Sequence, residues 1–484
     1  MTLSALPIEN LVAALAPLLG PQGIITEAAG IERYTVDFWH QHKGTTPLVL
    51  RPDSTEAVAA IVREAARLGV AIVPQSGNSG LVAGGIPDGS GRQVVLSLER
   101  LNRIRAVDAA GGSLVAEAGC ILADVQAAAD GAGRLFPLSL GAEGSCRIGG
   151  NLSTNAGGVN VLRYGMTRQL VLGLEVVLAD GRVWNGLRAL RKDNTGYDLK
   201  QLFIGAEGSL GIITAAVLRL YPRPRERRTI WLGIESPADA LRLLSLFQDH
   251  LGELISSFEL IAGLGVEAAN DHLPGGRRPL AEPHPWHLLI EVAWSLDGGL
   301  DVPVDRALEA GFDAGLVQDG TIAQNEAQRT AMWLIREGQS EATTKVGHVQ
   351  RSDISVAIAD LPALIARAEA HFGKLAPDVQ LFPFGHVGDG NLHFNFLIPR
   401  DREGVPELRS LLNEHLMMLV AEFGGSFSAE HGIGRLKRGE LERRKDPLEL
   451  ELMRRLKATL DPTGILNPGV ILAAPDAPAS REIS

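Results

Sequence analysis

The sequence predicts an α+β protein built from more than one domain. Its 484 residues suffice for two to four domains, at about 100–200 residues per domain. In the first half, short apolar runs alternate with glycine-rich stretches, and from about Thr229 apolar strands mix with helical patterns. This mixture is typical of an α+β fold whose second domain begins near residue 225.

The first half is expected to contain short strands and one clearly signalled helix. Residues 47–52 form an apolar strand ended by Pro52, and Ser54 stands where it caps a helix with apolar residues at helical spacing. Pro222 and Pro224 indicate a domain boundary. An amphipathic helix is expected at residues 8–19, and strands at residues 70–74, 94–98, 114–118, 170–178 and 211–220.

The second half is expected to form a separate α+β domain. An apolar stripe from Leu408 to Phe423, ended by Gly424, predicts a long packed helix. Strands are expected at residues 231–234, 287–292 and 353–358, and helices at 241–247, 304–310 and 361–372. The expected segments are 1–40 (N-terminal, helical), 41–224, 225–425, 426–474 and 475–484 (a flexible tail).

Composition and charge exclude several classes of protein. The net charge is −11, and the sequence has no basic patch of the kind that binds nucleic acid. Cys120 and Cys146 are too few for a disulfide framework or a cysteine zinc site, which indicates a reducing compartment. The first twenty residues contain no Lys or Arg, and no apolar run approaches the ~20 residues of a membrane span. We therefore expect a soluble, cytoplasmic protein without a transmembrane segment or a nucleic-acid partner.

Three glycine-rich loops in the first half suit the pyrophosphate of a dinucleotide. The first loop, residues 74–85, follows a strand; its glycines let backbone N–H groups approach an anion, and Ser76, Asn78 and Ser79 add neutral donors. No Lys stands in the Walker position, which argues against a nucleoside triphosphate. A plain glycine-rich turn is the alternative for this loop. The second and third loops cover residues 140–158 and 203–213.

A fourth glycine pattern is interpreted as structural. Gly263, Gly265 and Ala268 fit the Rossmann pattern G-x-G-x-x-A. The match stands alone, without neighbouring βαβ alternation or a convincing acidic ribose ligand. We interpret it as a turn.

Two histidines of the second half are expected to meet across a hairpin. The turn signal Gly388-Asp-Gly390 separates two apolar runs, so His386 and His393 lie on opposite strands. Side chains alternate along a strand, which puts His393 and Asn395 on one face. Two imidazoles in this arrangement suit a divalent metal, although a histidine near a glycine turn is more often structural. Leu392, Phe394 and Phe396 are expected to face a core.

A third ligand is available about forty residues further on. Glu430 and His431 precede the flexible segment Gly432-Ile-Gly434. The carboxylate of Glu430 completes a His–His–Glu site with an open position for substrate. The imidazole of His431 can exchange a proton at neutral pH, as a general base must. A surface Glu–His pair is the alternative.

The three loops, in this order and spacing, resemble the FAD domain of the vanillyl-alcohol oxidase/PCMH-type flavoprotein superfamily. Two segments are similar to D-2-hydroxyglutarate dehydrogenases and their D-lactate- and glycolate-oxidising relatives: Gly144-Ser-Cys-Arg-Ile-Gly-Gly-Asn151 and Leu190-Arg-Lys-Asp-Asn-Thr-Gly-Tyr-Asp-Leu-Lys-Gln-Leu-Phe-Ile-Gly205. The resemblance covers about Thr35 to Leu472. It implies a PCMH-type FAD-binding domain of two α+β subdomains. An α+β substrate (cap) domain with an antiparallel sheet and a C-terminal helical segment follow.

FAD is therefore the expected cofactor. Members of the superfamily often attach FAD through a His in the first loop; Asn78 stands there, so non-covalent binding is expected. Cys146 is near a position of cysteine attachment in some members, but its spacing differs, and a buried thiol is the preferred interpretation. The residues expected around FAD are Gln75, Ser76, Gly77, Asn78, Ser79, Gly80, Leu81, Leu140, Gly141, Gly144, Ser145, Gly149, Gly150, Asn151, Thr154, Asn155, Glu207, Gly208, Gly211, Ile212, Ile213 and Asn467.

The resemblance also implies roles in the second half. Its zinc ligands match His386, His393 and Glu430, its substrate-binding Asn matches Asn395, and its catalytic His matches His431. An Arg and a Thr that hold substrate carboxylate match Arg336 and Ser340, one helical turn apart. Arg351 replaces a Lys of the 2-hydroxyglutarate enzymes, which leaves the length of the accepted acid open. Lys345 is a further candidate, and a solvated surface charge is the alternative for each cation.

The expected function is oxidation of a D-2-hydroxy acid to the 2-oxo acid, with hydride transfer to N5 of FAD. D-2-Hydroxyglutarate is the preferred substrate and D-malate is a second dicarboxylate. The alternatives are a D-lactate or glycolate dehydrogenase, a non-catalytic flavin-binding subunit of an electron-transfer complex, and a purely structural metal. An electron-transfer flavoprotein or a quinone is the expected electron acceptor, and a homodimer is left open.

Overall fold

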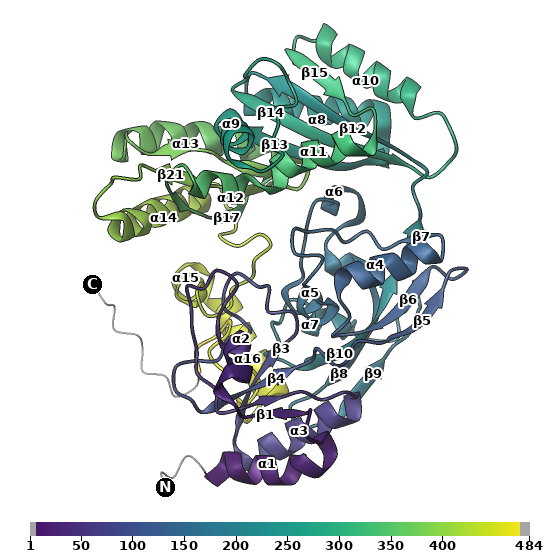
Figure 1. The fold of residues 1–484 in the computed structure, drawn as a ribbon, viewed down its shortest axis with the longest axis vertical. Coiled ribbons are helices and arrows are strands. Elements are labelled where there is room, and N and C mark those ends of the chain that lie inside the picture. The colour runs from purple at the N-terminus through teal and green to yellow at the C-terminus, as the bar shows by residue number, and fades with distance from the viewer. Residues whose placement is uncertain (1–5, 475–484) are drawn as a thin grey trace. The chain divides into compact units, whose positions relative to one another are not determined.

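The computed structural model describes residues 6–474 and divides into two compact units (Figure 1). Within these residues the first unit comprises residues 6–157, Met166–Pro222 and residues 430–474. The second unit comprises Gly158–Gly165 and Arg223–Ala429. Each unit contains both helices and sheets, so the α+β prediction is confirmed. The tail expected at residues 475–484 lies outside the described residues.

The first sheet of the first unit has the strand order β1-β2-β4-β3. Strands β2, β3 and β4 are parallel, and β1 is antiparallel to β2. Ser54 caps α3 as predicted, since its side chain accepts a hydrogen bond from the N–H of Ala57 at 3.2 Å. The strands are β1 (Ile24–Ile25), β2 (Val49–Leu50), β3 (Ala71–Gln75) and β4 (Gln93–Ser97).

The second sheet of this unit is antiparallel, in the order β5-β6-β10-β8-β9. Its central strand β10 is buried along nearly its whole length, as a strand covered on both faces must be. The strands are β5 (Ile104–Asp108), β6 (Ser113–Glu117), β8 (Val171–Val177), β9 (Val183–Gly186) and β10 (Ile212–Arg219), and a separate pair joins β7 (Arg134–Leu135) to β11 (Tyr221–Pro222).

The end of the described chain returns to the first sheet. The N–H of Ile72 donates to the carbonyl of Ile465 at 2.8 Å, and the N–H of Asn467 donates to the carbonyl of Ile72 at 2.7 Å. Ile465 and Leu466 therefore share a core with α1, α3 and the sheet. The helices of this unit are α1 (Leu6–Leu19), α2 (Ala28–Thr35), α3 (Thr55–Leu68), α4 (Leu122–Gly131), α5 (Ile148–Thr154), η1 (Thr167–Leu170), α7 (Lys200–Phe203), α15 (Arg438–Arg444) and α16 (Pro447–Leu460).

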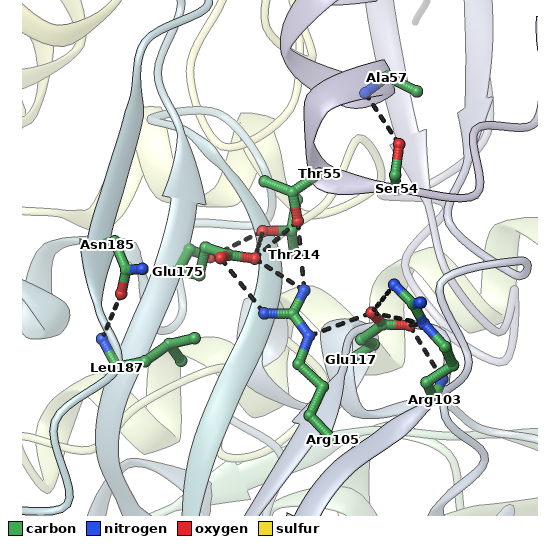
Figure 2. Close-up of polar contacts among 10 residues, drawn as sticks. All are labelled: Ser54, Thr55, Ala57, Arg103, Arg105, Glu117, Glu175, Asn185, Leu187 and Thr214. Carbon is green, nitrogen blue, oxygen red and sulfur yellow. Dashed lines mark hydrogen bonds and ion pairs between the residues drawn. The ribbon is translucent and has the colours of Figure 1, made fainter.

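Two buried carboxylates of the second sheet share one arginine (Figure 2). Glu175 accepts hydrogen bonds from Thr55 at 2.7 Å, from Thr214 at 2.8 Å and from Arg105 at 3.0 Å. The Nε of Arg105 also donates to Glu117 at 3.1 Å. Burial raises the pKa of both carboxyls. The hydrogen bonds and charge just named lower the pKa of Glu175 below its usual range, and Arg103, followed by Arg105, does so for Glu117. The network therefore ties α3 to the sheet.

We expect Arg105→Met to destabilise the protein by about 3 kcal/mol, the low end of the range for breaking a buried ion pair, because Arg105 is partly exposed. The variant leaves Glu175 without a cation. Urea denaturation of the FAD-loaded protein measures the change. Arg182→Met, which removes an exposed pair with Asp180, is the control and should cost less than about 1 kcal/mol. Equal losses in the two variants would contradict a stabilising role for the network.

The second unit is built on a seven-stranded sheet in the order β15-β12-β14-β13-β19-β20-β17. Its long central strands carry apolar side chains on both faces, because helices cover both faces. Even-numbered residues of β12 such as Ile230 pack with α8, α10 and α13, whereas Trp231 packs with α9, α11 and α12. The strands are β12 (Glu226–Ile234), β13 (Ile255–Ala262), β14 (Trp286–Trp294), β15 (Asp319–Ile322), β17 (Asp353–Ser355), β19 (Phe384–His386) and β20 (Asn391–His393).

A smaller sheet, β16-β21-β18, continues the second unit. Its strands are β16 (His348–Gln350), β18 (Gln380–Leu381) and β21 (Phe396–Ile398). The helices of the unit are α6 (Val161–Tyr164), α8 (Pro237–Leu251), η2 (Gly252–Leu254), α9 (Gly263–His272), α10 (Asp301–Asp313), α11 (Glu326–Glu337), α12 (Gln339–Thr344), η3 (Ile358–Asp360), α13 (Leu361–Leu375), η4 (Val387–Asp389) and α14 (Val405–Glu422).

The Gly263 pattern is structural but forms the first turn of α9, not a separate turn. A Cβ at Gly263 would collide with the carbonyl of His284, and one at Gly265 would collide with Gln339 of α12. The two glycines therefore permit close packing of α9. No helix among the described residues is both long enough and apolar enough to cross a membrane.

Both thiols of the chain are buried in the first unit, and Cys120 and Cys146 form no disulfide. Burial raises the pKa of both thiols, that of Cys120 to about 11. A thiol in this state is a poor nucleophile. The burial of Cys146 agrees with its interpretation as a packed side chain.

His287, the second residue of β14, is buried and is expected to make the protein sensitive to acid. Its Nδ1 accepts a hydrogen bond from Trp231 at 3.1 Å, and burial lowers its pKa to about 4. Unfolding restores the ordinary value of about 6.5, so the unfolded chain binds more protons, and stability falls as the pH drops from about 6.5 to 4. We expect His287→Gln, which keeps an acceptor for Trp231, to remove about 2–3 kcal/mol of this loss. Urea midpoints at pH 7 and pH 4.5 measure it; parallel losses in wild type and variant would contradict the assignment.

Candidate active site

The predicted hairpin is present in the second unit and brings His386 and His393 together. Strands β19 and β20 pair antiparallel, with His386 opposite Asn391 and Phe384 opposite His393. The two imidazole rings have centroids 5.7 Å apart, and each offers a ring nitrogen within 4.8 Å of the other. Two histidines at this separation can bind one divalent ion.

The strand after the turn is shorter than the sequence predicts. It ends at His393, and the chain passes into the smaller sheet at Phe396. Between them Asn395 is buried, and its Oδ1 accepts a long hydrogen bond of 3.4 Å from the N–H of Ser352. Leu392, Phe394 and Phe396 are buried in the core, as predicted.

Glu259 of β13 is a site residue that sequence reasoning missed. It is fully buried and lies opposite His386 in the sheet. Its Oε1 is 2.6 Å from Nδ1 of His386, and its Oε2 accepts a hydrogen bond of 2.7 Å from Nε of Arg336. Burial raises the pKa of this carboxyl, but the charges of Arg336 and His386 outweigh burial and lower it to about 2. A single Glu within a buried apolar strand is the signal that could have identified it.

Arg336 is buried at the end of α11, with its guanidinium 4.8 Å above the ring of Phe384. The helix expected to carry both Arg336 and Ser340 is divided at Gly338 into α11 and α12. A side chain at Gly338 would collide with Leu273, which explains the small residue at the break.

The other predicted cations differ in their surroundings. Arg351 is partly buried and donates from Nη2 to the carbonyl of Ser340 at 3.1 Å, so these two predicted residues are adjacent. Burial, followed by the nearby charge of Arg409, lowers the pKa of Arg351. Lys345 is exposed and pairs with Glu341 at 3.1 Å, as a solvated surface charge does.

A short segment carries the chain toward Glu430 and His431. Ser426 pairs with Ser355 of β17, and the N–H of Ala429 donates to Asp353 at 3.1 Å. Asp353 is itself the sheet partner of His393. Glu430 directly follows Ala429 in the chain, so its Cα lies about 3.8 Å from that of an anchored residue. Asp353, buried and also bonded to Asn391 at 3.0 Å, is a second residue that the sequence did not reveal.

In the first unit, the side chains of the first glycine-rich loop bind the protein itself. Gln75 donates to the carbonyl of Gly85 at 2.8 Å, Ser76 to that of Ala118 at 2.9 Å, and Asn78 to that of Val36 at 3.0 Å. These side chains therefore shape the loop. Among residues 6–474, no acceptor is present for the backbone N–H groups of residues 77–81. Such a run of N–H groups suits an anion.

Two buried asparagine oxygens in the first unit bear on whether this unit can hold FAD. Oδ1 of Asn151 and Oδ1 of Asn467 are buried and lack a hydrogen-bond partner within the described residues. Buried polar atoms are normally satisfied, so both sites fit a bound polar ligand. The other predicted FAD residues lie in the same unit: Ser79, Gly80, Leu81, Leu140, Gly141, Gly144, Ser145, Gly149, Gly150, Thr154, Asn155, Gly208, Gly211, Ile212 and Ile213.

Glu207 holds the segment that follows His431. Its two carboxylate oxygens accept hydrogen bonds of 2.8 Å each from the N–H groups of Ile433 and Gly434. Burial raises the pKa of this carboxyl to about 7, although the two N–H groups oppose the shift. The contact of Glu207 with FAD stays a prediction; in the structure its carboxylate orients the backbone after His431. Gly157 of the second loop lies against Glu430, because a Cβ there would collide with the Glu430 carboxylate.

Glycine-rich loops suited to an anion in the first unit and paired imidazoles in the second are features expected of a flavin-dependent oxidoreductase. Residues 46–186 match the family model "FAD binding domain", and residues 223–471 match "FAD linked oxidases, C-terminal domain". The chain belongs to this FAD-linked oxidase family, in the group of the D-2-hydroxyglutarate dehydrogenases, and is an FAD-dependent hydroxy-acid oxidoreductase.

Three relatives illustrate the group. The mitochondrial D-2-hydroxyglutarate dehydrogenase of Bos taurus is 41% identical over 95% of this chain and 83% of its own. The mitochondrial enzyme of Arabidopsis thaliana is 37% identical over 94% and 80%. The D-2-hydroxyglutarate dehydrogenase of Xanthomonas citri pv. viticola is 37% identical over 94% and 95%.

Two solved structures support the fold alone. An alkyldihydroxyacetonephosphate synthase has a TM-score of 0.73 at 18% identity, covering 95% of this chain and 85% of its own. A p-cresol methylhydroxylase has a TM-score of 0.73 at 17% identity, covering 98% of each chain. These similarities confirm the predicted PCMH-type architecture.

The predicted cytoplasmic location is wrong. The relatives from Arabidopsis thaliana, Bos taurus, Rattus norvegicus and Danio rerio are all named as mitochondrial proteins. The prediction rested on the small number of cysteines, which does not distinguish one reducing compartment from another, and on the lack of Lys and Arg in the first twenty residues.

Proposed function

We propose that the protein oxidises D-2-hydroxyglutarate to its 2-oxo acid with FAD as the hydride acceptor. The observation that carries this proposal is a histidine pair, one member of which, His386, shares the carboxylate of Glu259 with the buried Arg336. A 2-hydroxy dicarboxylate offers a hydroxyl and a carboxylate to a metal and a second carboxylate to arginines. The names of the relatives support the same substrate.

The proposed metal site consists of His386, His393 and Glu430. Two imidazoles and one carboxylate form the donor set of open catalytic zinc sites. The ring nitrogens within 4.8 Å of each other support the histidine part. Glu430 directly follows Ala429, whose N–H donates to Asp353. Asp353 belongs to β17 and is the sheet partner of His393. Bound zinc would polarise the substrate oxygen and so make the hydroxyl more acidic.

His431 is the proposed base that accepts the hydroxyl proton. It is next to Glu430 in the chain, so a base and a metal ligand arrive on adjacent residues. The carboxylate of Glu207 restrains the backbone two and three residues later, which supports a defined position for the imidazole.

The proposed substrate-binding residues are Arg336, Ser340, Arg351 and Asn395. Arg336 uses Nε for Glu259, so its terminal nitrogens are the donors for a carboxylate. The hydrogen bond of Arg351 to Ser340 supports a common site for these two residues. Asn395 is proposed to contact the end of the substrate that carries the hydroxyl. Lys345 is not included, because it is exposed and paired with Glu341.

FAD is proposed to bind non-covalently in the first unit, with its pyrophosphate on the N–H groups of residues 77–81. Asn78 is no nucleophile, and its amide is hydrogen-bonded to the carbonyl of Val36. FAD would accept the hydride at N5 of its ring. Denaturation should therefore release free FAD, and flavin that stays with the chain would exclude this mode of binding.

The test is an anaerobic panel of D-2-hydroxyglutarate, D-malate, D-lactate and glycolate, with flavin absorbance as the readout. Bleaching that is fastest with D-2-hydroxyglutarate supports the proposal. Preference for D-lactate or glycolate by a large factor in kcat/KM would replace it by that alternative. Absence of bleaching with every acid would favour a non-catalytic flavin subunit.

The reoxidant is proposed to be an electron-transfer flavoprotein or a quinone. A yeast relative, 34% identical over 90% of this chain and 88% of its own, is named a D-2-hydroxyglutarate–pyruvate transhydrogenase. A 2-oxo acid is therefore a third acceptor to include. Mixing the reduced protein with each acceptor separately identifies the one that restores flavin absorbance fastest.

Arg351→Leu tests whether Arg351 binds the far carboxylate. Loss of a charge-assisted hydrogen bond, about 1.5–3 kcal/mol, corresponds to a loss of about 10–100-fold in kcat/KM for D-2-hydroxyglutarate. D-Lactate lacks that carboxylate and should lose little. Arg367→Leu, which removes an exposed cation paired with Glu422, is the matched control. Equal losses for both acids would contradict the assignment.

A further inference from the structure

A buried carboxylate in the second unit connects a predicted metal ligand to a predicted substrate-binding residue. Glu259 lies in the centre of β13, and every residue of that strand is buried. A buried charge is costly unless it is paired and hydrogen-bonded. Glu259 has one such partner on each oxygen: His386 at 2.6 Å on Oε1 and Arg336 at 2.7 Å on Oε2.

The sheet register fixes this arrangement. Glu259 is the direct partner of His386 across the β13–β19 pair, so its side chain and the imidazole lie on the same face. Phe384, two residues before His386, presents its ring to the Arg336 guanidinium at 4.8 Å and to the His393 ring at 5.0 Å. Arg336 is thus held by a carboxylate that contacts His386 and by an aromatic ring that contacts His393.

A second buried glutamate shows what a purely structural pair looks like in this sheet. Glu291 of β14 is 5% exposed and accepts a hydrogen bond from Nε of Arg329 at 2.8 Å. Arg329 lies on α11, the helix that also carries Arg336. The other partners of Glu291 are Trp333 at 3.0 Å and Thr229 at 3.2 Å, and neither is a metal ligand. Glu259 differs from Glu291 chiefly in having a histidine as its second partner.

We propose that Glu259 is a positioning residue that links metal binding to substrate binding: it keeps the proton of His386 on Nδ1, so that Nε2 faces the metal, and it orients Arg336 through Nε. This inference rests on the proposed function, because it takes His386 as a zinc ligand. Histidines that bind metals commonly donate their other N–H to a carboxylate, and loss of that partner typically weakens metal binding 10–100-fold.

Glu259→Gln should separate the two partners. An amide has one acceptor oxygen and one NH₂ group, whereas His386 Nδ1–H and Arg336 Nε–H both need acceptors. The NH₂ group of the glutamine therefore faces either the Nε–H of Arg336, where two donors would oppose each other, or the Nδ1 of His386. In the latter case it forces the proton of His386 onto Nε2, the nitrogen that the metal needs. Glu259→Asp keeps two acceptor oxygens and the charge, so it should preserve most of the metal affinity.

The experiment measures zinc affinity of the full-length, FAD-loaded, metal-stripped protein by competition with a chromophoric chelator, without substrate. The expected result is binding about 10–100-fold weaker in Glu259→Gln than in wild type. Glu291→Gln should bind zinc as wild type does, although it loses comparable thermal stability. His386→Ala is the control for a lost ligand. KM for D-2-hydroxyglutarate, measured at saturating zinc, should rise in Glu259→Gln and stay unchanged in Glu291→Gln.

The outcomes separate the role of Glu259 from the existence of the metal site. If wild type binds zinc and Glu259→Gln binds it equally well, the inference is overturned and the metal site stands. If wild type and His386→Ala both fail to bind zinc, the metal site itself is rejected, and the inference falls with it. Should Glu259→Gln not fold, Glu259→Asp serves as the test. Zinc affinity reduced to that of His386→Ala would show that a carboxylate at this position does not suffice to keep the proton of His386 on Nδ1, and would overturn the inference.

Discussion

Replacing His431 by asparagine is expected to lower the rate of anaerobic flavin reduction by D-2-hydroxyglutarate by about 10²–10⁴-fold, the range for a positioned general base. Asparagine keeps hydrogen-bonding capacity but cannot accept a proton at neutral pH. Stopped-flow absorbance of the flavin measures the rate. FAD content and zinc content, measured on the same samples, should equal those of wild type.

His250→Asn is the matched control for this variant, because His250 is exposed on α8. It should reduce flavin at the wild-type rate. If His431→Asn slows reduction less than about tenfold, another group takes the proton, since a base contributes at least about 10²-fold. A loss that accompanies loss of FAD or zinc would instead assign a structural role to His431.

Removal of the metal is expected to have an effect of similar size. A bound divalent ion supplies several kcal/mol of charge stabilisation, and about 4 kcal/mol corresponds to roughly a 10³-fold loss in turnover. Chelation of the FAD-loaded protein, followed by titration with zinc, should abolish and then restore activity. The flavin spectrum and the far-UV circular dichroism should stay unchanged throughout.

The control for the metal experiment is a second histidine pair in the same unit. Nε2 of His371 and Nδ1 of His415 are 2.9 Å apart, but among the described residues no third ligand completes a group around them. His415→Ala should leave zinc content unchanged, whereas His393→Ala should lose zinc. Turnover that survives complete removal of zinc would make the metal structural.

Local signals predicted the framework of the site correctly. The Gly388-Asp-Gly390 turn predicted the hairpin, because glycine allows the left-handed conformation that Gly390 adopts at φ 80°. Ser54 predicted the start of α3 through a hydrogen bond within four residues. The three loop motifs suggested a pyrophosphate site, since close approach of backbone to an anion favours small residues, and their resemblance to a flavoprotein superfamily pointed to FAD, in agreement with the matching FAD-binding domain model.

Long-range pairing could not be predicted in the same way. No spacing rule relates Glu259 to His386 and Arg336, which are far apart in the sequence and meet only through the sheet register and the packing of α11. The carboxylate of Glu207 is a similar case, because its partners Ile433 and Gly434 come from the end of the chain. The need for a small residue at Gly338 likewise comes from Leu273 of a neighbouring segment.

The fold class and the histidine hairpin could be predicted from short motifs and from the period of apolar residues. FAD and the roles of the site residues came from the family resemblance that those motifs carry. The folded structure was needed to show which carboxylate bonds to His386, which one restrains the segment after His431, and which cations are buried. Those choices depend on contacts between residues distant in the chain, and burial, which sets the strength of each charge interaction, exists only after the core has formed.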